Sequence, residues 1–394
     1  MLAATVRVTR DLDAAEEAVQ DAYVQALRTW ARDGVQERPG AWLTTVARRT
    51  ALNALRRRRK LETYLPLLLE REDTEMPDFE TDEIPDDRLR LIFTCCHPAL
   101  APEAQIALTL RLVCGVATRD IAAALLVTET TMAARLTRAK KKIAAARIPY
   151  AVPASGELPE RVDTVLTVIH LLYASGHTAH SGPELVRDEL TGRALDLARM
   201  LRVLLPADRE AAGLLALLLV HHARRETRTD AQGRLLRPEE QDRSQWNRDL
   251  IAEADRVVVD ALRAGPPGRF TLQAAIAALH AQAPSYPETD WPQILALYDQ
   301  LVRVWPSPVV ALNRAVAVAM VDGPAAALAE IDALERDGRL AGYRYLPATK
   351  ADLLHRLGRD AEAAEAYQAA LALSDNAAEQ EFLAARLASA RPAT

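Results

Sequence analysis

The sequence predicts an all-α protein with several domains. Its 394 residues are enough for two to four domains. Aromatic residues make up only 5% of the chain, and the abundance of alanine, leucine and arginine favours helices over sheets. Apolar residues recur at helical spacing along most of the chain, and no segment shows the convincing alternation that indicates a strand. The hydrophobic fraction of 49% is sufficient for buried cores.

Several classes of protein do not fit this sequence. No uninterrupted apolar stretch reaches about 18 residues, the length that indicates a membrane-spanning helix, and the run 214–220 predicts a buried helix instead. The first residues show no signal-peptide pattern, and three cysteines suit a reducing compartment, so we expect a cytoplasmic protein. We find no phosphate-binding glycine loop, nucleophile elbow or zinc-protease motif, and therefore expect neither an enzyme nor a cofactor.

Two groups of cysteine and histidine residues raise the question of a metal site. In the first group the adjacent cysteines are poorly spaced compared with Cys-x-x-Cys, and Cys114 lies in an apolar run. The second group could be a loop with ligands, although packing and loop chemistry also explain it. We therefore expect no metal. The two groups are Cys95, Cys96, His97 and Cys114, and His170, His177, His180, His221 and His222.

The first predicted helix runs from Asp11 to Trp30 and has an apolar face and an acidic face. The apolar residues follow the spacing i, i+3, i+4, i+7, which predicts that this face is buried. It consists of Ala15, Ala18, Val19, Ala22, Tyr23, Ala26, Leu27 and Trp30. The other face is either solvated or a docking face for a partner, and its residues are Asp13, Glu16, Glu17, Gln20, Asp21 and Gln25.

A second helix, predicted over residues 42–60, is strongly basic. Seven bases and no acid lie between Arg48 and Lys60, and they would repel one another unless a polyanion lies nearby. Such a helix is suited to salt-dependent contacts with phosphates. Trp42 at its start is either a core residue or a stacking platform for an unpaired base. The predicted buried face comprises Leu43, Val46, Ala47, Thr50, Ala51, Ala54 and Leu55.

The segment after the basic helix reverses the sign of the charge. Between Glu62 and Asp87, eleven acids stand against one base, Arg71, and three prolines interrupt the run. A stretch of this composition cannot form a core, so we expect an acidic linker. Residues 135–147 are basic again. The order is therefore basic helix, acidic linker, basic helix.

Residues 118–143 have the pattern of a helix-turn-helix. A short helix over 118–125 is followed by a tight turn, and Thr128 can cap the next helix, with Glu129 in its first turn. Small residues at the crossing, Ala122 and Ala123, let the two helices meet closely. The second helix would enter the major groove, where arginine can bond guanine and threonine can meet thymine methyl groups. Its buried face is predicted to be Met132, Leu136, Ala139 and Ile143.

The rear half of the chain predicts further helices. A polar loop at 227–240 and the breaker Gly265-Pro-Pro-Gly268 interrupt them. Residues 353–371 are similar to a tetratricopeptide repeat, and residues 315–331 align with them one repeat earlier, with Gly323 against Gly358. The segment containing 291–305 is expected to supply another, diverged pair. Such arrays either bind protein segments on a concave face or serve as a structural cap.

Three segments in this order resemble the sigma-70 family of transcription initiation factors. Residues 11–23 resemble the helix that binds core RNA polymerase, residues 41–59 the segment that melts the promoter and reads its −10 element, and residues 120–143 the helix-turn-helix that reads the −35 element. The match is to extracytoplasmic-function factors with a long C-terminal helical extension. Phe93-Thr-Cys-Cys-His-Pro-Ala-Leu and Glu240-Gln-Asp-Arg-Ser-Gln-Trp are similar to motifs of that subgroup.

The resemblance implies roles for residues in each segment. The acidic face of residues 13–25 would bind the clamp helices of the largest polymerase subunit. Contacts to the −10 element are expected from Trp42, Thr45, Arg48, Arg49, Asn53 and Arg56. Contacts to the −35 element are expected from Thr130, Thr131, Arg135, Arg138 and Lys141. Little precedes Asp11, so the first helix of the polymerase-binding domain is expected to be short.

The sequence therefore predicts a non-catalytic sigma factor that recruits core RNA polymerase to promoters, with no membrane partner. The rear half is expected to regulate it, and its repeats to bind a regulatory protein. Two alternatives stay open: a polymerase-independent helix-turn-helix regulator of duplex DNA, and a metal-dependent enzyme built around His177 and His180. The expected domains are 1–61 for polymerase and −10 binding, 62–87 as acidic linker, 88–150 for −35 binding, 151–290 as helical middle domain and 291–394 as tetratricopeptide-like domain.

Overall fold

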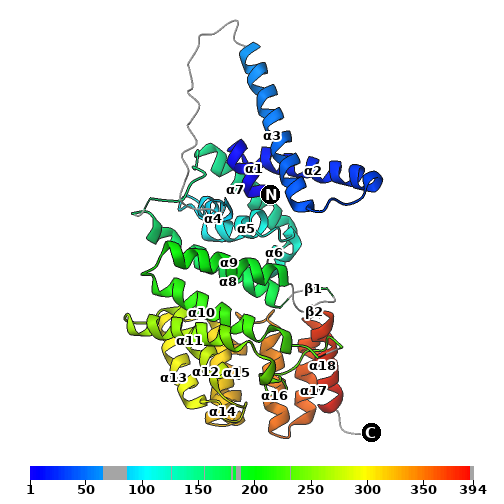
Figure 1. Ribbon diagram of the computed structural model, residues 1–394. Helices are drawn as coiled ribbons and strands as arrows, with labels where there is room; N and C mark the ends of the chain where they lie inside the picture. The colour runs from blue at the N-terminus through cyan, green and yellow to red at the C-terminus, as the bar shows by residue number, and fades with distance from the viewer. Residues whose placement is uncertain are drawn as a thin grey trace. The chain divides into compact units, whose positions relative to one another are not determined.

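The computed structural model describes residues 1–64, 87–125, 127–154, 156–178, 181–182, 188–230 and 232–390. These residues form eighteen α-helices and two strands of two residues each, which confirms the all-α prediction. The chain divides into two compact units, Met1–Val168 and Ile169–Thr394 (Figure 1). The boundary falls within α8 (Leu158–His177). Of the described helices, none is long and apolar enough to cross a membrane. Residues 65–86 of the predicted acidic linker lie outside the described residues.

The first unit begins with three helices that pack on one another, α1 (Leu2–Thr9), α2 (Leu12–Asp33) and α3 (Pro39–Tyr64). The Asp11 side chain caps α2 by accepting hydrogen bonds from the backbone amides of Asp13 and Ala14, at 2.9 and 3.1 Å. The short first helix expected from the sequence is α1.

The buried stripe of α2 is narrower than the sequence predicted. Its alanines, Ala15, Ala18, Ala22 and Ala26, are buried. Tyr23 and Leu27 are 52% and 74% exposed, so the prediction that they are core residues is wrong. The small alanine side chains let α2 pack closely against its neighbours. These neighbours cover only the centre of the apolar face, and the larger residues at its edge remain in solvent.

Helix α3 is buried only where α1 and α2 cover it. Ala47 and Ala51 are buried, and Leu43, Val46, Thr50 and Leu55 are partly buried. Ala54 is exposed, contrary to the prediction. The reason is visible in Figure 1, where α3 continues past the ends of its two neighbours. Residues 52–54, 56 and 57 are accordingly exposed.

A second group of helices in this unit comprises α4 (Asp87–Cys95), α5 (Pro102–Leu112), α6 (Thr118–Ala124) and α7 (Glu129–Ala145). Thr128 caps α7 by accepting a hydrogen bond from the amide of Thr131 at 3.2 Å, as predicted. The predicted inner face of α7 is also confirmed, since Met132, Leu136, Ala139 and Ile143 are all buried. Helices α5 and α6 both pack on α7. This arrangement is a helix-turn-helix with α6 and α7 as its two helices.

Tyr150 joins the two groups of helices in the first unit. Its hydroxyl lies 3.0 Å from the carbonyl oxygen of Ala3 and 2.7 Å from that of Asp87, which begin the two groups. Arg10 donates from Nη1 to the carbonyl oxygen of Tyr150 at 2.9 Å. Helices α1 and α4 also pack against each other. Segments far apart in the sequence therefore fold into one compact unit.

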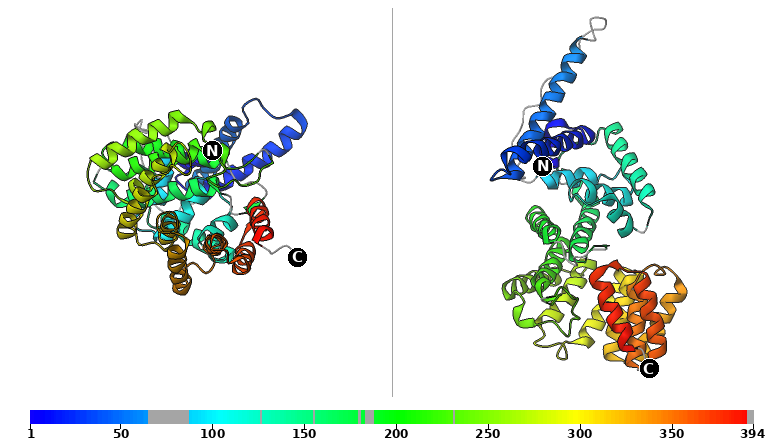
Figure 2. Two further views of the ribbon diagram at one scale, coloured as in Figure 1. Left: turned by 90° about the horizontal axis from the view of Figure 1, so that it is seen from below. Right: turned by 90° about the vertical axis from the view of Figure 1, so that its right-hand side faces the viewer.

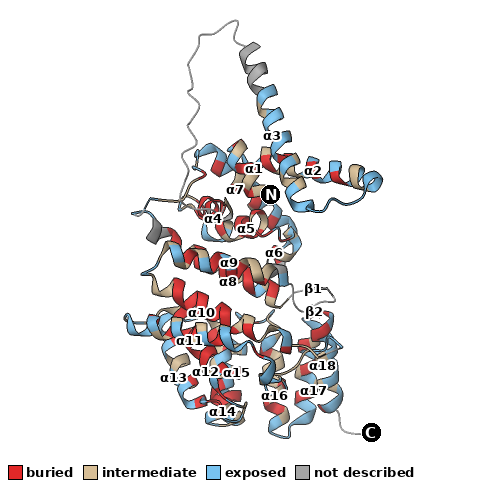
Figure 3. Cartoon of the chain, in the orientation of Figure 1, coloured by how far each residue is buried: buried red, intermediate tan, exposed pale blue. Residues whose placement is uncertain are grey.

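The second unit is built around α10 (Arg209–Ala223), which is buried along most of its length (Figure 3). Around it pack α9 (Asp188–Leu204), α11 (Arg248–Arg263) and α12 (Arg269–Gln282). The apolar run 214–220 forms the centre of α10, as predicted. Gly213 is required at the crossing with α12, because a Cβ atom there would lie 2.5 Å from the backbone nitrogen of Thr271.

Glu210 fixes the start of α12 from the neighbouring helix. Its carboxylate accepts hydrogen bonds from the amides of Phe270 and Thr271, at 2.8 and 3.1 Å, and from the Thr271 hydroxyl at 2.6 Å. Gly268 precedes α12, and a Cβ atom at this position would lie 2.4 Å from the same carboxyl group. The Gly-Pro-Pro-Gly segment therefore ends α11 and also admits an acidic cap to the next helix.

Six helices complete the second unit, and each packs on the next (Figure 2). They are α13 (Trp291–Val304), α14 (Pro308–Val321), α15 (Pro324–Asp337), α16 (Tyr345–Arg356), α17 (Asp360–Ala372) and α18 (Ala377–Ala390). Gly323 and Gly358 occupy the turns α14–α15 and α16–α17 with φ of 94° and 70°, which favours glycine. The two predicted repeats therefore correspond to two helix pairs, each with a positive-φ glycine in its turn.

A short pairing links the end of α8 to the last helix of the chain. Strand β1 (Ser181–Gly182) runs parallel to β2 (Asp375–Asn376), with Gly182 opposite Asn376. The side chain of Asn376 caps α18 by accepting hydrogen bonds from the amides of Ala378 and Glu379. The predicted polar loop lies between α10 and α11 and contains two short 3₁₀ turns, Arg225–Thr227 and Arg243–Gln245.

Candidate nucleic-acid interface

The outer side of α3 carries the residues that the sequence assigned to the −10 element. Because successive helical residues turn by about 100°, five of these six residues share the side opposite Ala47 and Ala51, and Arg48 lies on its flank. Thr45, Arg48, Arg49, Asn53 and Arg56 are exposed, and Trp42 is partly buried. Within the described part of the chain, no carboxylate pairs with Arg48, Arg49 or Arg56. This side of the helix therefore offers unneutralised positive charge to a polyanion.

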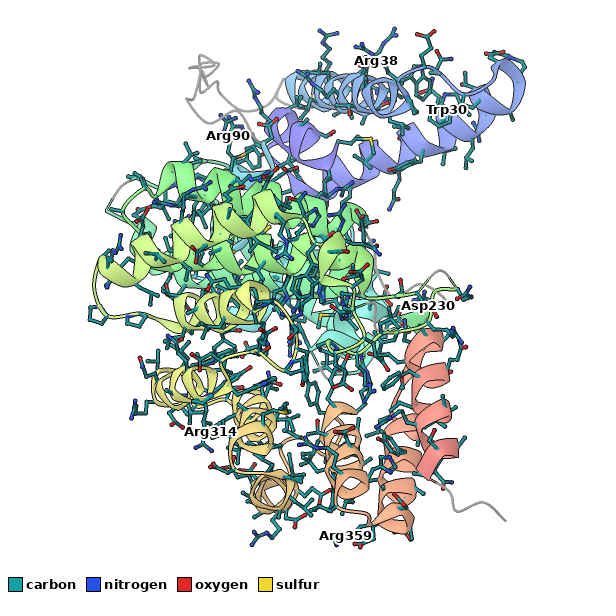
Figure 4. The ribbon with its side chains drawn as sticks, turned by 60° about the horizontal axis from the view of Figure 1, so that its bottom comes forward. Trp30, Arg38, Arg90, Asp230, Arg314 and Arg359 are labelled. Atoms are coloured by element: carbon teal, nitrogen blue, oxygen red, sulfur yellow. The ribbon has the colours of Figure 1, made fainter. Side chains whose placement is uncertain are left out.

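Trp42 lies against Trp30 of α2, which Figure 4 labels. The two ring centroids are 5.4 Å apart and the rings are inclined by 52°. The contact holds the start of α3 against the end of α2, and it fits the interpretation of Trp42 as a core residue. One part of the ring remains open to solvent, since the residue is only partly buried. The alternative of a stacking platform for a base is therefore compatible with this position.

The first turns of α7 present the residues assigned to the −35 element. Thr130, Thr131, Arg138 and Lys141 are exposed, whereas Arg135 is partly buried. Arg135 and Arg138 line a groove of about 270 Å³ between α7 and the start of α5. Glu103 of α5 lines the same groove. Thr130, Thr131, Arg138 and Lys141 therefore lie away from the buried face of α7, and Arg135 lies at its edge beside α5.

The acidic face of α2 is partly engaged inside the unit. Of its six predicted polymerase-binding residues, five are exposed and Glu16 is partly buried; Asp13 and Glu16 are ion-paired with α7. Lys140 of α7 donates from Nζ to Asp13 at 2.7 Å and to Glu16 at 2.8 Å. Burial would lower the pKa of Lys140, but the hydrogen bonds to these carboxylates outweigh that effect and raise it. A residue of the −35 helix is thus ion-paired with two residues expected to bind polymerase.

The cysteines of the first unit are buried, and burial raises the pKa of Cys96 to about 12. In the second unit His177 and His221 lie with their ring centroids 5.3 Å apart. Burial lowers the pKa of both histidines well below the usual value. His180 lies outside the described residues. Among the described residues, no three His, Cys, Asp or Glu side chains gather in a way that could hold a metal ion.

The first subgroup motif lies largely in the core of the first unit, and the second contributes the buried Trp246 to the second unit. Phe93, Cys95 and Cys96 lie in the core of the first unit, and the buried Arg161 donates to the carbonyl oxygen of Phe93 at 3.3 Å. Trp246, at the end of the second motif, is 3% exposed and donates from Nε1 to the Thr227 hydroxyl at 2.9 Å. Both motifs thus have a packing role in the fold.

Sequence reasoning missed the ion pairs of Lys140 and a set of buried arginines in the second unit. Lys140 is separated from Glu16 by 124 residues along the chain. The one hint of these pairs in the sequence was that Lys140 does not share the side of the helix on which the exposed bases lie. Arg224, at the end of α10, stands next to an apolar run and gave no signal of its own.

Comparisons with known proteins agree with this architecture. Residues 2–61 match the family described as Sigma-70 region 2, and residues 90–143 match Sigma-70, region 4. Residues 161–262 match a family of unknown function, DUF6596. The chain is 44% identical over 401 residues to an uncharacterized protein of Rhizobium meliloti (strain 1021), covering 100% of this chain and 94% of that protein. The two sigma-70 matches coincide with the α1–α3 group and with the α4–α7 group, which contains the helix-turn-helix. The chain therefore belongs to the sigma-70 family, as a sigma factor with a long helical C-terminal extension.

Proposed function

We propose that this sigma factor directs promoter-specific initiation by reading two separate DNA elements while bound to core RNA polymerase. The observation that carries the proposal is the pair of exposed basic surfaces, on α3 and α7, whose arginines have no carboxylate partner among the described residues. Two dissimilar surfaces in one chain suit an asymmetric promoter. A polymerase-independent regulator would instead be expected to dimerise on palindromic sites.

In this proposal α3 contacts the −10 element. Arg48, Arg49 and Arg56 would neutralise phosphates, and Thr45 and Asn53 would lie close to base edges. Trp42, at the start of the same side, would stack on a base in the melted strand. The exposure of Asn53 and Arg56 beside Arg48 and Arg49 supports this role, because nucleic acid could reach all four side chains.

Helix α7 contacts the −35 element in the same proposal. Its first turns enter the major groove, where Arg135 and Arg138 bond guanine edges and Thr130 and Thr131 contact thymine methyl groups. Lys141, one turn further along, would meet a phosphate. The capped, exposed start of α7 supports this assignment, since the recognition helix of a helix-turn-helix uses its N-terminal residues.

Core polymerase binds through the acidic side of α2, and the polymerase supplies the catalytic chemistry. Glu17, Gln20, Asp21 and Gln25 are exposed and unengaged by Lys140, and the carboxylates of Asp13 and Glu16 become fully available when Lys140 releases them. We further propose that the extension regulates the front half and that its tetratricopeptide-like helices bind a regulatory protein. The five domains predicted from the sequence, including the extracytoplasmic-function type of front half, are part of this proposal.

Reconstituted transcription tests the proposal. Purified protein, bacterial core polymerase and a library of promoter fragments should give promoter-specific initiation, which the double variant Arg135→Ala/Arg138→Ala should abolish. Arg336→Ala, an exposed arginine of α15, is the matched control and should leave initiation unchanged. Duplex binding without initiation under any condition would contradict the sigma mechanism and favour the polymerase-independent regulator.

The regulatory role needs a separate experiment. A chain that ends after α8 is compared with the full chain for promoter activity in cells and in the reconstituted assay. Activity gained on truncation would mean that the extension inhibits, and activity lost would mean that it is required. Circular dichroism must show that the truncated chain keeps its helices. Equal activity of the two chains would refute a regulatory extension.

A further inference from the structure

The second unit contains a cavity of about 220 Å³ where the end of α10 meets α12, α13 and α14. Arg224, the C-cap residue of α10, lines one side of it. His280, Trp291 and Tyr298 supply aromatic walls. The remaining lining residues are Pro238, Tyr286, Asn313, Val316 and Ala317. No aspartate or glutamate is among these described lining residues, so the cavity holds a cationic group without an anionic one.

Arg224 lacks the partner that a buried guanidinium normally has. Its Nε is buried without a hydrogen-bond acceptor, and none of the described carboxylates forms an ion pair with it. Its guanidinium lies 5.6 Å from the centroid of the Trp246 ring, a contact that leaves the charge unneutralised. A buried charge without a counter-ion costs several kcal/mol in general. An unpaired arginine facing a cavity therefore indicates a missing anion.

Arg243 provides an internal comparison. It lies on the same Trp246 ring, 4.9 Å from the centroid, but donates from Nη1 to the carbonyl oxygens of His280 and Ala283 at 2.8 and 2.6 Å. The fold thus satisfies one of the two arginines on this ring with main-chain acceptors. The other faces the cavity with no protein acceptor among the described residues.

The protonation states of the lining residues agree with an anion site. Burial, reinforced by Arg228 and Arg243, lowers the pKa of Arg224 to about 10, so the group is still cationic at neutral pH. Burial, with Arg224 and Arg243 nearby, lowers the pKa of His280 to about 4. His280 is therefore neutral and acts as an aromatic wall. It adds no second charge to the cavity.

Two further donors face this space. The indole nitrogen of Trp291 is buried and has no acceptor among the described residues. Burial raises the pKa of Tyr298 to about 12, so its hydroxyl keeps its proton and can donate. An oxyanion would satisfy both Arg224 and a neighbouring donor at once, and the aromatic side chains would enclose an apolar body.

We propose that this cavity binds a small aromatic carboxylate, with its carboxylate on Arg224 and its ring among His280, Trp291 and Tyr298. The volume limits the ligand to one or two rings, because it is smaller than the pockets of drug-sized molecules, which begin at about 300 Å³. The exposed side chain of Asn313 lies at the solvent side of the lining and leaves a route of entry. The site is independent of the surfaces assigned to promoter and polymerase.

Calorimetry on the full chain tests the site with indole-3-acetate, indole-3-carboxylate and benzoate as probes. At least one of these acids should bind saturably with one site per chain, and its neutral amide should bind about tenfold more weakly or not at all. Arg224→Gln should weaken binding of the acid by about tenfold or more. Arg303→Gln, an exposed arginine on the same helix as Trp291, should bind like the unmodified chain.

A second variant keeps the proposal testable if Arg224→Gln fails to fold. Trp291→Phe keeps an aromatic wall but removes the indole donor. It should weaken binding of the acid by about threefold to tenfold. Three results would overturn the proposal: no saturable binding of any acid at millimolar concentration, equal affinity for acid and amide, or unchanged affinity in a folded Arg224→Gln variant. Because binding is measured without polymerase or DNA, these results leave the transcription proposal to its own test.

Discussion

The two units treat their basic residues in opposite ways. In the first unit, Arg48, Arg49 and Arg56 on α3, and Arg138 on α7, are exposed and have no carboxylate partner among the described residues. In the second unit three bases of the repeat helices are ion-paired. Arg314 bonds Asp299 and Glu330, Arg359 bonds Glu362, and Lys350 bonds Asp332 and Glu335 (Figure 4 labels Arg314 and Arg359).

The difference shows that local pairing decides which surface can attract a polyanion. The whole chain has a formal net charge of −5, which would not suggest nucleic-acid binding. A paired arginine already has its counter-ion, and a phosphate would have to displace it. An unpaired arginine with solvent counter-ions releases them on binding. The front unit is therefore suited to DNA, whereas the rear surfaces are suited to holding their own helices together.

Removing the unpaired bases of α3 should have the largest effect. We expect Arg48→Ala/Arg49→Ala/Arg56→Ala to weaken promoter binding by the polymerase complex by about 100-fold at physiological salt, and to reduce the salt slope by about 2 to 3. Fluorescence anisotropy with labelled promoter DNA over a salt series measures both quantities. The matched variant Arg314→Ala/Lys350→Ala/Arg359→Ala, in which each base has an ion-pair partner, should change neither. An equal loss in this control would mean that pairing does not distinguish the units.

Removing an internal carboxylate of the rear unit should cost stability. Glu210 accepts three hydrogen bonds at the start of α12 and is close to the positive end of that helix. Glu210→Ala should lower the free energy of unfolding of the rear unit by about 2 kcal/mol. Urea unfolding followed by circular dichroism measures this change. Glu362→Ala, which removes only an exposed ion pair, should cost less than about 1 kcal/mol. Similar losses in both variants would contradict the capping role.

Acid should destabilise the rear unit through its buried histidines. Burial lowers the pKa of His170 and His280 to about 4, whereas histidine in an unfolded chain has its ordinary pKa of about 6.5. Below pH 6.5 the unfolded chain binds more protons than the folded one, so stability falls as the pH falls toward 4. Each histidine should lower the free energy of unfolding by about 1 to 2 kcal/mol between pH 7 and pH 5. Unfolding at these two pH values tests this, and His280→Gln should reduce the difference. A stability independent of pH would refute it.

Freeing the acidic side of α2 should have the smallest effect. Lys140→Ala removes the ion pairs to Asp13 and Glu16, which would otherwise compete with polymerase. Because partly exposed pairs contribute about 0.3 to 1 kcal/mol, polymerase affinity should rise by about twofold to fivefold. Titration of labelled protein with core polymerase measures the change. Lys142→Ala, an exposed lysine of the same helix, is the control. A weaker affinity of the Lys140 variant would mean that the contact helps the binding conformation.

Local patterns predicted the helices better than they predicted burial. The inner face of α7 was correct at all four positions, because α5 and α6 cover that helix from one side. The face of α2 was too wide, since periodicity says which side of a helix is apolar and not how much of it a partner covers. Tyr23 and Leu27 belong to the correct side and are still exposed.

For the candidate site, too, part of the arrangement was predictable from the sequence and part was not. The residues assigned to the two DNA elements lie on common sides of α3 and α7, which helical spacing alone placed together. Their contacts with DNA and polymerase stay predictions. The engagement of Asp13 and Glu16 by Lys140 was not predictable, because these residues meet only after the two groups of helices fold on each other. No pattern within a few residues contains that information.

By itself the sequence determined the approximate positions of several helices, which side of each is apolar and where the basic runs lie. These properties depend on caps such as Thr128, on turn residues such as Gly323 and on spacing, all of which act over a few residues. Only the tertiary structure decided which charges are neutralised. Arg243 received main-chain acceptors and Arg224 received none among the described residues, although both lie on one tryptophan ring. Neutralisation requires an acceptor within hydrogen-bond distance, and folding brings that acceptor from remote parts of the chain.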